Sequence, residues 1–108
     1  MGRLIYDNTT AVEFDDRVLA HLQLVIGTKL RRGESFYLNW TDDVSVGDGR
    51  NAIWLNPAIP LRFKFDGGRR PTLNMSWISQ LMISAGSTEG LRLAPEPTEE
   101  HQRAGEAL

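Results

Sequence analysis

The side chains best placed to do chemistry lie in one glycine-rich segment, WTDDVSVGDGRNAIWLNP, at positions 40–57. A turn within it can present backbone N–H groups and a guanidinium to an anion, and it consists of Gly47, Asp48, Gly49 and Arg50. No Lys-Ser or Lys-Thr pair follows the glycines, so the segment matches neither a Walker loop nor a dinucleotide-binding turn. The interpretation that we favour is a hairpin loop from Asp42 to Asn51, although a loop of this length often carries function.

Acids and histidines are the other reactive candidates. Asp42, Asp43 and Asp48 form the densest carboxylate group, but they lack the alternate spacing and the final Glu of a calcium loop. His21 falls on the flank of an apolar helical stripe, where we expect a boundary residue rather than a general base, and His101 lies in the C-terminal tail. The chain has no cysteine, which excludes thiol catalysis and cysteine-bound metals. We predict no metal site and no cofactor.

Three segments, 35–41, 52–57 and 59–65, alternate apolar and polar residues with the period of a half-buried strand. One row is apolar and consists of Phe36, Leu38, Trp40, Ile53, Leu55, Leu61, Phe63 and Phe65. The opposite row, together with one residue from a short strand at 91–93, is the predicted binding face. Its members are Tyr37, Asn39, Trp54, Asn56, Arg62, Lys64 and Arg92.

Aromatic and cationic side chains on one sheet face suit two kinds of partner. They form protein interfaces, including those between identical chains. They also stack bases and hold phosphate in proteins that bind single-stranded nucleic acid. We predict an interaction module that associates with itself or with another protein, and we keep single-stranded nucleic-acid binding as the alternative. A face that is only solvated is the third interpretation.

Two amphipathic helices must support these strands. Asp15 or Asp16 can cap a first helix, whose apolar residues recur every three or four positions until Gly33. Asn74 can cap a second helix, which ends at Gly86.

Two short strands, 4–6 and 12–14, begin the chain and flank a cluster of turn-forming residues. The order of elements is therefore β-β-α-β-β-β-α-β. It predicts an α+β fold, a two-layer sandwich with a mainly antiparallel sheet and both helices on one face.

Length and composition agree with one domain, because 108 residues with 41% hydrophobic and 24% charged side chains can bury a core. We predict a domain at 1–94 and a flexible acidic tail at 95–108, where four acids and one arginine give a net charge of −3. Residues 1–94 carry 11 Lys or Arg and 10 Asp or Glu, which disfavours duplex binding through phosphate neutralisation alone. No stretch approaches the roughly 18 apolar residues of a membrane span, so we expect a cytoplasmic protein without a membrane partner.

Three stretches carry a resemblance to a known family: FDDRVLAHLQLVIGTKLRRGESF (14–36), SVGDGRNAIWLNPAIPLRFKF (45–65) and GLRLAPEP (90–97). They resemble a family of short, uncharacterised actinobacterial proteins, and the similarity covers nearly all of residues 1–97. Genome annotation often labels members of that family as ATP-dependent DNA ligases or ligase-like proteins. The resemblance therefore implies one small domain and raises nucleotidyl transfer as a further hypothesis.

An ATP-dependent ligase attacks ATP with the lysine of a Lys-x-Asp-Gly motif. In Val-Gly-Asp-Gly at 46–49, valine occupies the nucleophile position and cannot attack ATP. Lys-Phe-Asp-Gly at 64–67 has the letters of the motif, which makes Lys64 the one catalytic candidate. Lys64 belongs to the outward row of a strand, however, and the Asp-Gly-Gly sequence at 66–68 is typical of the turn that ends a strand. Because Lys29 is the only other lysine, downstream phosphate-binding lysines are missing, and we expect no self-contained ligase activity.

Overall fold

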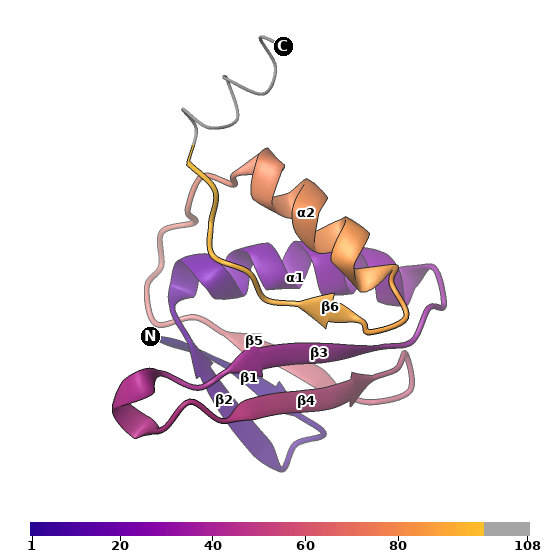
Figure 1. Cartoon of the computed structure of the whole chain (residues 1–108), viewed down its shortest axis with the longest axis horizontal. Helices are drawn as coiled ribbons and strands as arrows, with labels where there is room; N and C mark the ends of the chain where they lie inside the picture. The colour runs from indigo at the N-terminus through magenta and orange to yellow at the C-terminus, as the bar shows by residue number, and fades with distance from the viewer. Residues whose placement is uncertain (99–108) are drawn as a thin grey trace, which may run out of the picture. The chain divides into compact units, whose positions relative to one another are not determined.

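Two helices are interspersed among groups of strands in a computed structural model that describes residues 1–98 (Figure 1). The elements in chain order are β1 (Gly2–Tyr6), β2 (Thr10–Phe14), α1 (Asp16–Arg31), β3 (Phe36–Thr41), the short 3-10 helix η1 (Val44–Val46), β4 (Arg50–Leu55), β5 (Leu61–Lys64), α2 (Met75–Ala85) and β6 (Leu91–Arg92). The predicted α+β class and the order β-β-α-β-β-β-α-β are confirmed. His101 and most of the predicted acidic tail lie outside the described residues.

The strands of the described part form two three-stranded sheets, whereas the alternation suggested one. The first sheet has the order β2-β1-β5 and is antiparallel throughout, and the second has the order β4-β3-β6. In the second sheet β3 pairs antiparallel with β4 and parallel with β6. Alternation shows which side chains point inward, but it does not specify which strands pair.

The chain divides accordingly into two compact units. The first unit comprises residues 1–35 and 56–73, and it holds β1, β2, α1 and β5. The second unit comprises residues 36–55 and the described residues from 74 onward, and it holds β3, β4, α2 and β6. In both units a hairpin provides a central and an edge strand, and the third strand pairs with the central one.

In the first unit, α1 packs against β1 and forms the second layer. Gly2 permits this approach, because a Cβ atom there would lie 2.7 Å from Leu19 Cδ2 and 2.8 Å from the carbonyl oxygen of Lys64. The fully buried apolar residues of the unit are Leu4, Leu19, Leu22, Val25 and Ile26. As predicted, the helix gives way at Gly33, which adopts a φ of +79° that favours glycine.

The β1–β2 hairpin turns at Asp7 and Asn8, which have φ values of 52° and 59°. Both central residues of a type I′ turn need positive φ, and short Asp and Asn side chains tolerate it better than most. The N–H of Thr9 closes the turn by donating to the carbonyl oxygen of Tyr6 at 3.0 Å. The cluster of turn-forming residues therefore acts as the sequence predicts.

In the second unit, α2 packs against β6 and β3. The predicted cap is confirmed, since Asn74 Oδ1 accepts hydrogen bonds from the backbone N–H groups of Ser76 and Trp77. The same side chain donates through Nδ2 to Glu96 Oε2 at 3.0 Å and to the carbonyl oxygen of Pro97 at 2.9 Å. The start of the predicted tail is thus bound to the start of α2.

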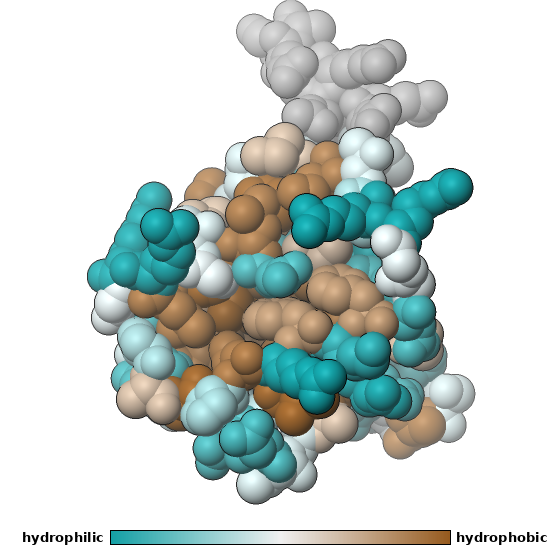
Figure 2. All heavy atoms as spheres, turned by 180° about the vertical axis from the view of Figure 1, so that it is seen from behind, coloured by the Kyte–Doolittle hydropathy of each residue, from teal (hydrophilic) through white to brown (hydrophobic). Residues whose placement is uncertain are grey.

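Apolar and hydrophilic side chains are interspersed on the face shown in Figure 2. The exposed large apolar residues are Met1, Leu24, Tyr37, Val46, Trp54, Leu73, Met75 and Ile83. Within the described residues, neither helix is long and apolar enough to cross a membrane.

Candidate interaction surfaces on the two sheets

The structure divides the seven residues of the predicted binding face between the two units. Tyr37, Asn39, Trp54 and Arg92 belong to the second sheet, whereas Arg62 and Lys64 belong to β5 of the first sheet. Asn56 follows β4 in the turn that leads toward β5. The predicted alternation itself is confirmed, because Tyr37, Trp54, Arg62, Lys64 and Arg92 are exposed.

Tyr37 and Trp54 form the most distinctive feature of the second sheet, which we call the aromatic pair. They lie directly opposite each other on β3 and β4, with ring centroids 5.0 Å apart and an interplanar angle of 66°. This edge-to-face contact is a favoured aromatic geometry. The two residues nevertheless remain 47% and 44% exposed. The sheet therefore holds a preassembled aromatic surface in contact with solvent.

The hydrogen-bond register of the hairpin explains why the two rings meet. Asp42 N–H donates to the carbonyl oxygen of Gly49 at 2.8 Å, so residues 42 and 49 form a hydrogen-bonded pair. Hydrogen-bonded and non-hydrogen-bonded pairs alternate along an antiparallel ladder. Tyr37 and Trp54 therefore form a non-hydrogen-bonded pair, in which the side chains lie closest together.

The alternation of hydrogen-bonded and non-hydrogen-bonded pairs also determines which backbone groups β4 presents at its outer edge. Residues at non-hydrogen-bonded positions direct their backbone N–H and C=O groups away from β3. Arg50 and Ala52 occupy such positions, opposite Thr41 and Asn39 respectively, and both are exposed. Because β4 is an edge strand of its sheet, these backbone groups can pair with another strand.

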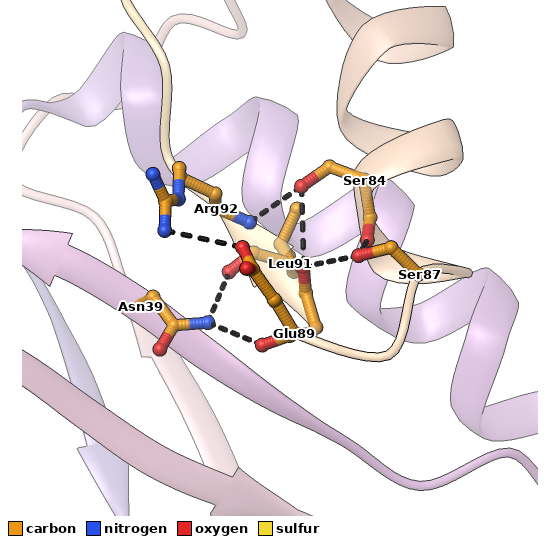
Figure 3. Close-up of polar contacts among 7 residues, drawn as sticks. Asn39, Ser84, Ser87, Glu89, Leu91 and Arg92 are labelled. Carbon is orange, nitrogen blue, oxygen red and sulfur yellow. Dashed lines mark hydrogen bonds and ion pairs between the residues drawn. The ribbon is translucent and has the colours of Figure 1, made fainter.

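Asn39 and Arg92 lie in a polar network that ties β6 to β3 (Figure 3). The Asn39 amide donates to the carbonyl oxygens of Glu89 and Leu91, at 2.9 and 3.3 Å. Ser84 Oγ, from α2, accepts from the Arg92 N–H at 2.7 Å. Asn39 is therefore a structural residue, and the sequence prediction missed this because its two partners lie 50 and 52 residues later in the chain.

The guanidinium group of Arg92 lies at the exposed surface of the second sheet. It lies 3.3 Å from Glu89 Oε2, and the two side chains are 70% and 75% exposed. An ion pair this exposed contributes little to stability.

Asn56 also has a local structural role. Its Nδ2 donates to Ser35 Oγ at 2.8 Å, and its Oδ1 accepts from the Ala58 N–H at 2.9 Å. The second contact is an Asx turn, which redirects the chain after β4.

The first sheet presents a different surface, which we call the cationic face: Arg3, Arg62 and Lys64. Arg3 on β1 lies directly opposite Lys64 on β5, and Arg62 is two residues from Lys64 along the same strand. All three side chains are exposed. Arg3 was missed because the sequence predicted a strand that begins at Leu4, whereas β1 begins at Gly2. Its alternation with the buried Leu4 was the signal that could have found it.

The turn at 66–68 that follows β5 is anchored to α1. Asp16 Oδ1 accepts from the Asp66 N–H at 3.2 Å, and Oδ2 accepts from the Gly67 N–H at 2.9 Å. These bonds, that of Gly67 foremost, hold the pKa of Asp16 below its usual value. Asp15 occupies the N-cap position of α1 without a side-chain capping bond. Lys64 of the Lys-x-Asp-Gly sequence thus stands before an ordinary turn, as the sequence predicts.

The loop between β3 and β4 is the hairpin connection that the sequence predicts, and η1 lies within it. It covers residues 42–49 rather than 42–51, because Arg50 and Asn51 belong to β4 and pair with β3. Asp42 Oδ1 accepts from Asn51 Nδ2 at 2.8 Å, and Asp43 Oδ1 accepts from the Ser45 N–H at 3.1 Å. Two of its carboxylates thus support the loop itself. Anion binding by the Gly-Asp-Gly-Arg turn stays a prediction, and these nearby acids oppose it.

One family model, a domain of unknown function named DUF7882, matches residues 1–96. The chain belongs to the DUF7882 family. The match covers both units, including Glu96, which binds the Asn74 cap. Neither a curated protein nor a solved structure matches the chain.

His21 of this DUF7882 domain is fully buried, so its predicted place at the boundary of the core is wrong. Its Nδ1 lies 2.7 Å from the carbonyl oxygen of Arg17. Because a carbonyl only accepts, Nδ1 carries the proton in this contact. A local bond to the preceding helical turn thus allows the imidazole to join the core, which apolar periodicity alone does not reveal.

The structure brings together no group of three or more acids and histidines that could hold a metal ion within the part of the DUF7882 domain that it describes.

Proposed function

We propose that the DUF7882 domain is a protein-interaction module that self-associates through the second sheet. The observation that carries this proposal is the aromatic pair, which is preassembled on an edge hairpin and nearly half exposed. Tyr and Trp are enriched at protein interfaces because they bury a large area at a small cost in conformational entropy.

The edge of β4 supplies the second contact of the proposed interface. Two antiparallel copies of β4 related by a two-fold axis at Ala52 would pair Ala52 with Ala52 and Arg50 with Trp54 of the second copy. The outward backbone groups of Arg50 and Ala52 would then complete ladder hydrogen bonds. The same register brings the Arg50 guanidinium toward the indole of the second copy, where a cation–π contact is favourable.

Light scattering coupled to size-exclusion chromatography tests the proposal. The wild type is expected to elute as a dimer, and Trp54→Ala is expected to shift it toward the monomer mass. Ile83→Ala is the matched control, because Ile83 is an apolar residue of α2 that is 77% exposed. A wild type that stays monomeric at high micromolar concentration would contradict self-association.

A second variant separates the β4 edge from the aromatic pair. In Ala52→Pro, the proline removes only an N–H that points away from β3, so the hairpin ladder is kept. We expect a monomer with an unchanged far-UV circular dichroism spectrum. A dimer that survives Ala52→Pro but not Trp54→Ala would keep self-association and exclude the edge-to-edge register.

Nucleotidyl transfer through Lys64 ranks behind self-association. Lys64 is exposed at the end of β5, and Lys29 of α1 is the only other lysine in the chain, so further lysines that could hold the ATP phosphates are missing. Incubation with labelled ATP and Mg²⁺ distinguishes the two functions, because only the enzymatic one predicts a covalent adenylate that disappears in Lys64→Ala.

A further inference from the structure

The cationic face contains an arrangement that the first unit does not explain by itself. Arg3 and Lys64 are directly opposite neighbours in an antiparallel ladder, and like charges in that position destabilise a sheet. Asp7 N–H donates to the carbonyl oxygen of Pro60, which makes 3 and 64 a hydrogen-bonded pair, with Cα atoms about 5.5 Å apart. Arg62 adds a third cation roughly 7 Å along β5.

The rest of that sheet face supplies little countercharge. The residues that alternate outward with the three cations are Ile5, Ala11 and Glu13, and Glu13 lies opposite Arg3 on β2. Among residues 1–98, no ion pair involves Arg3, Arg62 or Lys64. The face therefore has three cations against one acid.

We propose that the cationic face binds the phosphate backbone of a nucleic acid. Arginine guanidinium groups form bidentate hydrogen bonds with phosphate, and a lysine adds a point charge. Arg62 and Lys64 follow β5 about 7 Å apart, close to the spacing of successive phosphates in an extended strand, and Arg3 lies beside Lys64 on β1. One phosphate between Arg3 and Lys64 would offset their mutual repulsion, and the next phosphate of the same strand would reach Arg62.

Two features of this face favour a nucleic acid over a membrane. Recognition of anionic lipid typically uses clusters of four to eight basic residues, often beside apolar side chains that insert. The outward row of the first sheet has three cations, and its apolar members are the half-buried Ile5 and the small Ala11. This row has no aromatic residue on which a base could stack, so the binding is independent of base sequence.

The inference does not depend on self-association, because it concerns the other unit. Its test is fluorescence anisotropy of a labelled single strand, with a duplex of the same sequence as a second arm. Three phosphate contacts predict a slope of log affinity against log salt of about −2 for the single strand and about −3 for the duplex. Affinity for the single strand should therefore fall about 20-fold between 50 and 200 mM salt.

Matched charge variants locate the site. Lys64→Glu and Arg62→Glu are expected to weaken binding at least 10-fold, and Glu13→Gln, which removes the opposing acid, is expected to strengthen it. Arg32→Glu is the control, because Arg32 is an exposed cation at the C-terminal end of α1 and lies outside both sheets. All variants should keep the circular dichroism spectrum of the wild type, since the substituted side chains are exposed.

Three results would overturn the proposal. The first is no measurable affinity for either oligonucleotide at 50 mM salt. The second is a loss in Arg32→Glu as large as that in Lys64→Glu, which would show a response to overall charge rather than binding at the cationic face. The third is a protein that binds phosphatidylserine vesicles but no oligonucleotide, and whose vesicle binding is abolished by Lys64→Glu. That result would make a lipid surface the partner.

Discussion

The two sheets of this protein share a plan and differ in what they present. In each unit a hairpin, a helix and a third strand build two layers, with the first strand of the hairpin in the centre. The outward row of the first sheet carries Arg3, Arg62 and Lys64, whereas that of the second carries Tyr37 and Trp54. The inward rows of the two sheets build similar cores, whereas the outward rows differ between the units and carry the two proposed binding surfaces.

The third strands also differ, and this difference has a structural cost. β5 pairs antiparallel with β1 over four residue positions, whereas β6 pairs parallel with β3 over only two. A two-residue parallel strand needs further support, which Asn39 and Ser84 provide through side-chain hydrogen bonds. The second sheet therefore depends on its side chains and on the loop before β6 more than the first depends on the turn before β5.

The largest loss of unfolding free energy is expected from a substitution in the loop before β6. A Cβ atom at Gly90 would lie 2.5 Å from the carbonyl oxygen of Tyr37 and 2.9 Å from its nitrogen, and the φ of Gly90 is +92°. Because both atoms are backbone, Gly90→Ala must displace β6 from β3, and we expect a loss of about 3 kcal/mol or more in unfolding free energy. Urea denaturation measures this loss.

Gly33→Ala is the matched control for that prediction. Gly33 also has positive φ, +79°, but no atom lies within 4 Å of the added Cβ. The control should cost about 1–2 kcal/mol, which is the penalty for the backbone conformation alone. Equal losses in the two variants would show that the contact with Tyr37 contributes nothing.

A smaller effect is expected from the cap of α2. Asn74→Ala removes the acceptor for Ser76 and Trp77 and the donor for Glu96 and Pro97, so we expect a loss of about 2 kcal/mol. Asn74→Asp keeps the capping oxygen but places a carboxylate beside Glu96. Thermal unfolding at low and high salt separates the two contributions, because only the repulsion in Asn74→Asp is screened. A loss in Asn74→Asp that does not change with salt would contradict the contact with Glu96.

Local signals predicted most of the fold. Caps and stops such as Asn74, Gly33 and Gly86 act within one helical turn, and alternation assigns faces strand by strand. Strand pairing is not local. β5 pairs with β1, which lies more than 50 residues earlier in the chain, and the strands form two sheets where alternation suggested one.

The candidate site was predicted only in part, for the same reason. Tyr37, Trp54, Arg62 and Lys64 are exposed as expected, because exposure follows from alternation. The role of Asn39 depends on a carbonyl group 50 residues away in the sequence. Arg3 was not predicted, because β1 begins at Gly2 and the predicted strand began at Leu4.

The smallest effect on stability is expected in the first unit. There the carboxylate of Asp16, rather than a glycine, anchors the turn that follows the third strand. The pKa of Asp16 is lowered by the N–H groups of Gly67 and Asp66, so the ionised form is favoured in the folded state. Its contribution to stability is therefore present above the unfolded pKa and is lost as the pH falls through the folded pKa. Wild type should have a higher urea midpoint than Asp16→Asn at neutral pH, and the difference should shrink as the pH falls below the ordinary carboxyl pKa of 3.8.

Asp15→Asn is the control for this pH dependence, because the neighbouring carboxylate makes no capping bond at the start of α1. It should follow the wild type across the whole pH range. If Asp15→Asn reproduced the pH dependence of Asp16→Asn, the effect would come from the general negative charge near the helix N-terminus. The specific anchor between α1 and the turn after β5 would then have to be abandoned, and with it the view that the first sheet depends on this carboxylate where the second depends on Gly90.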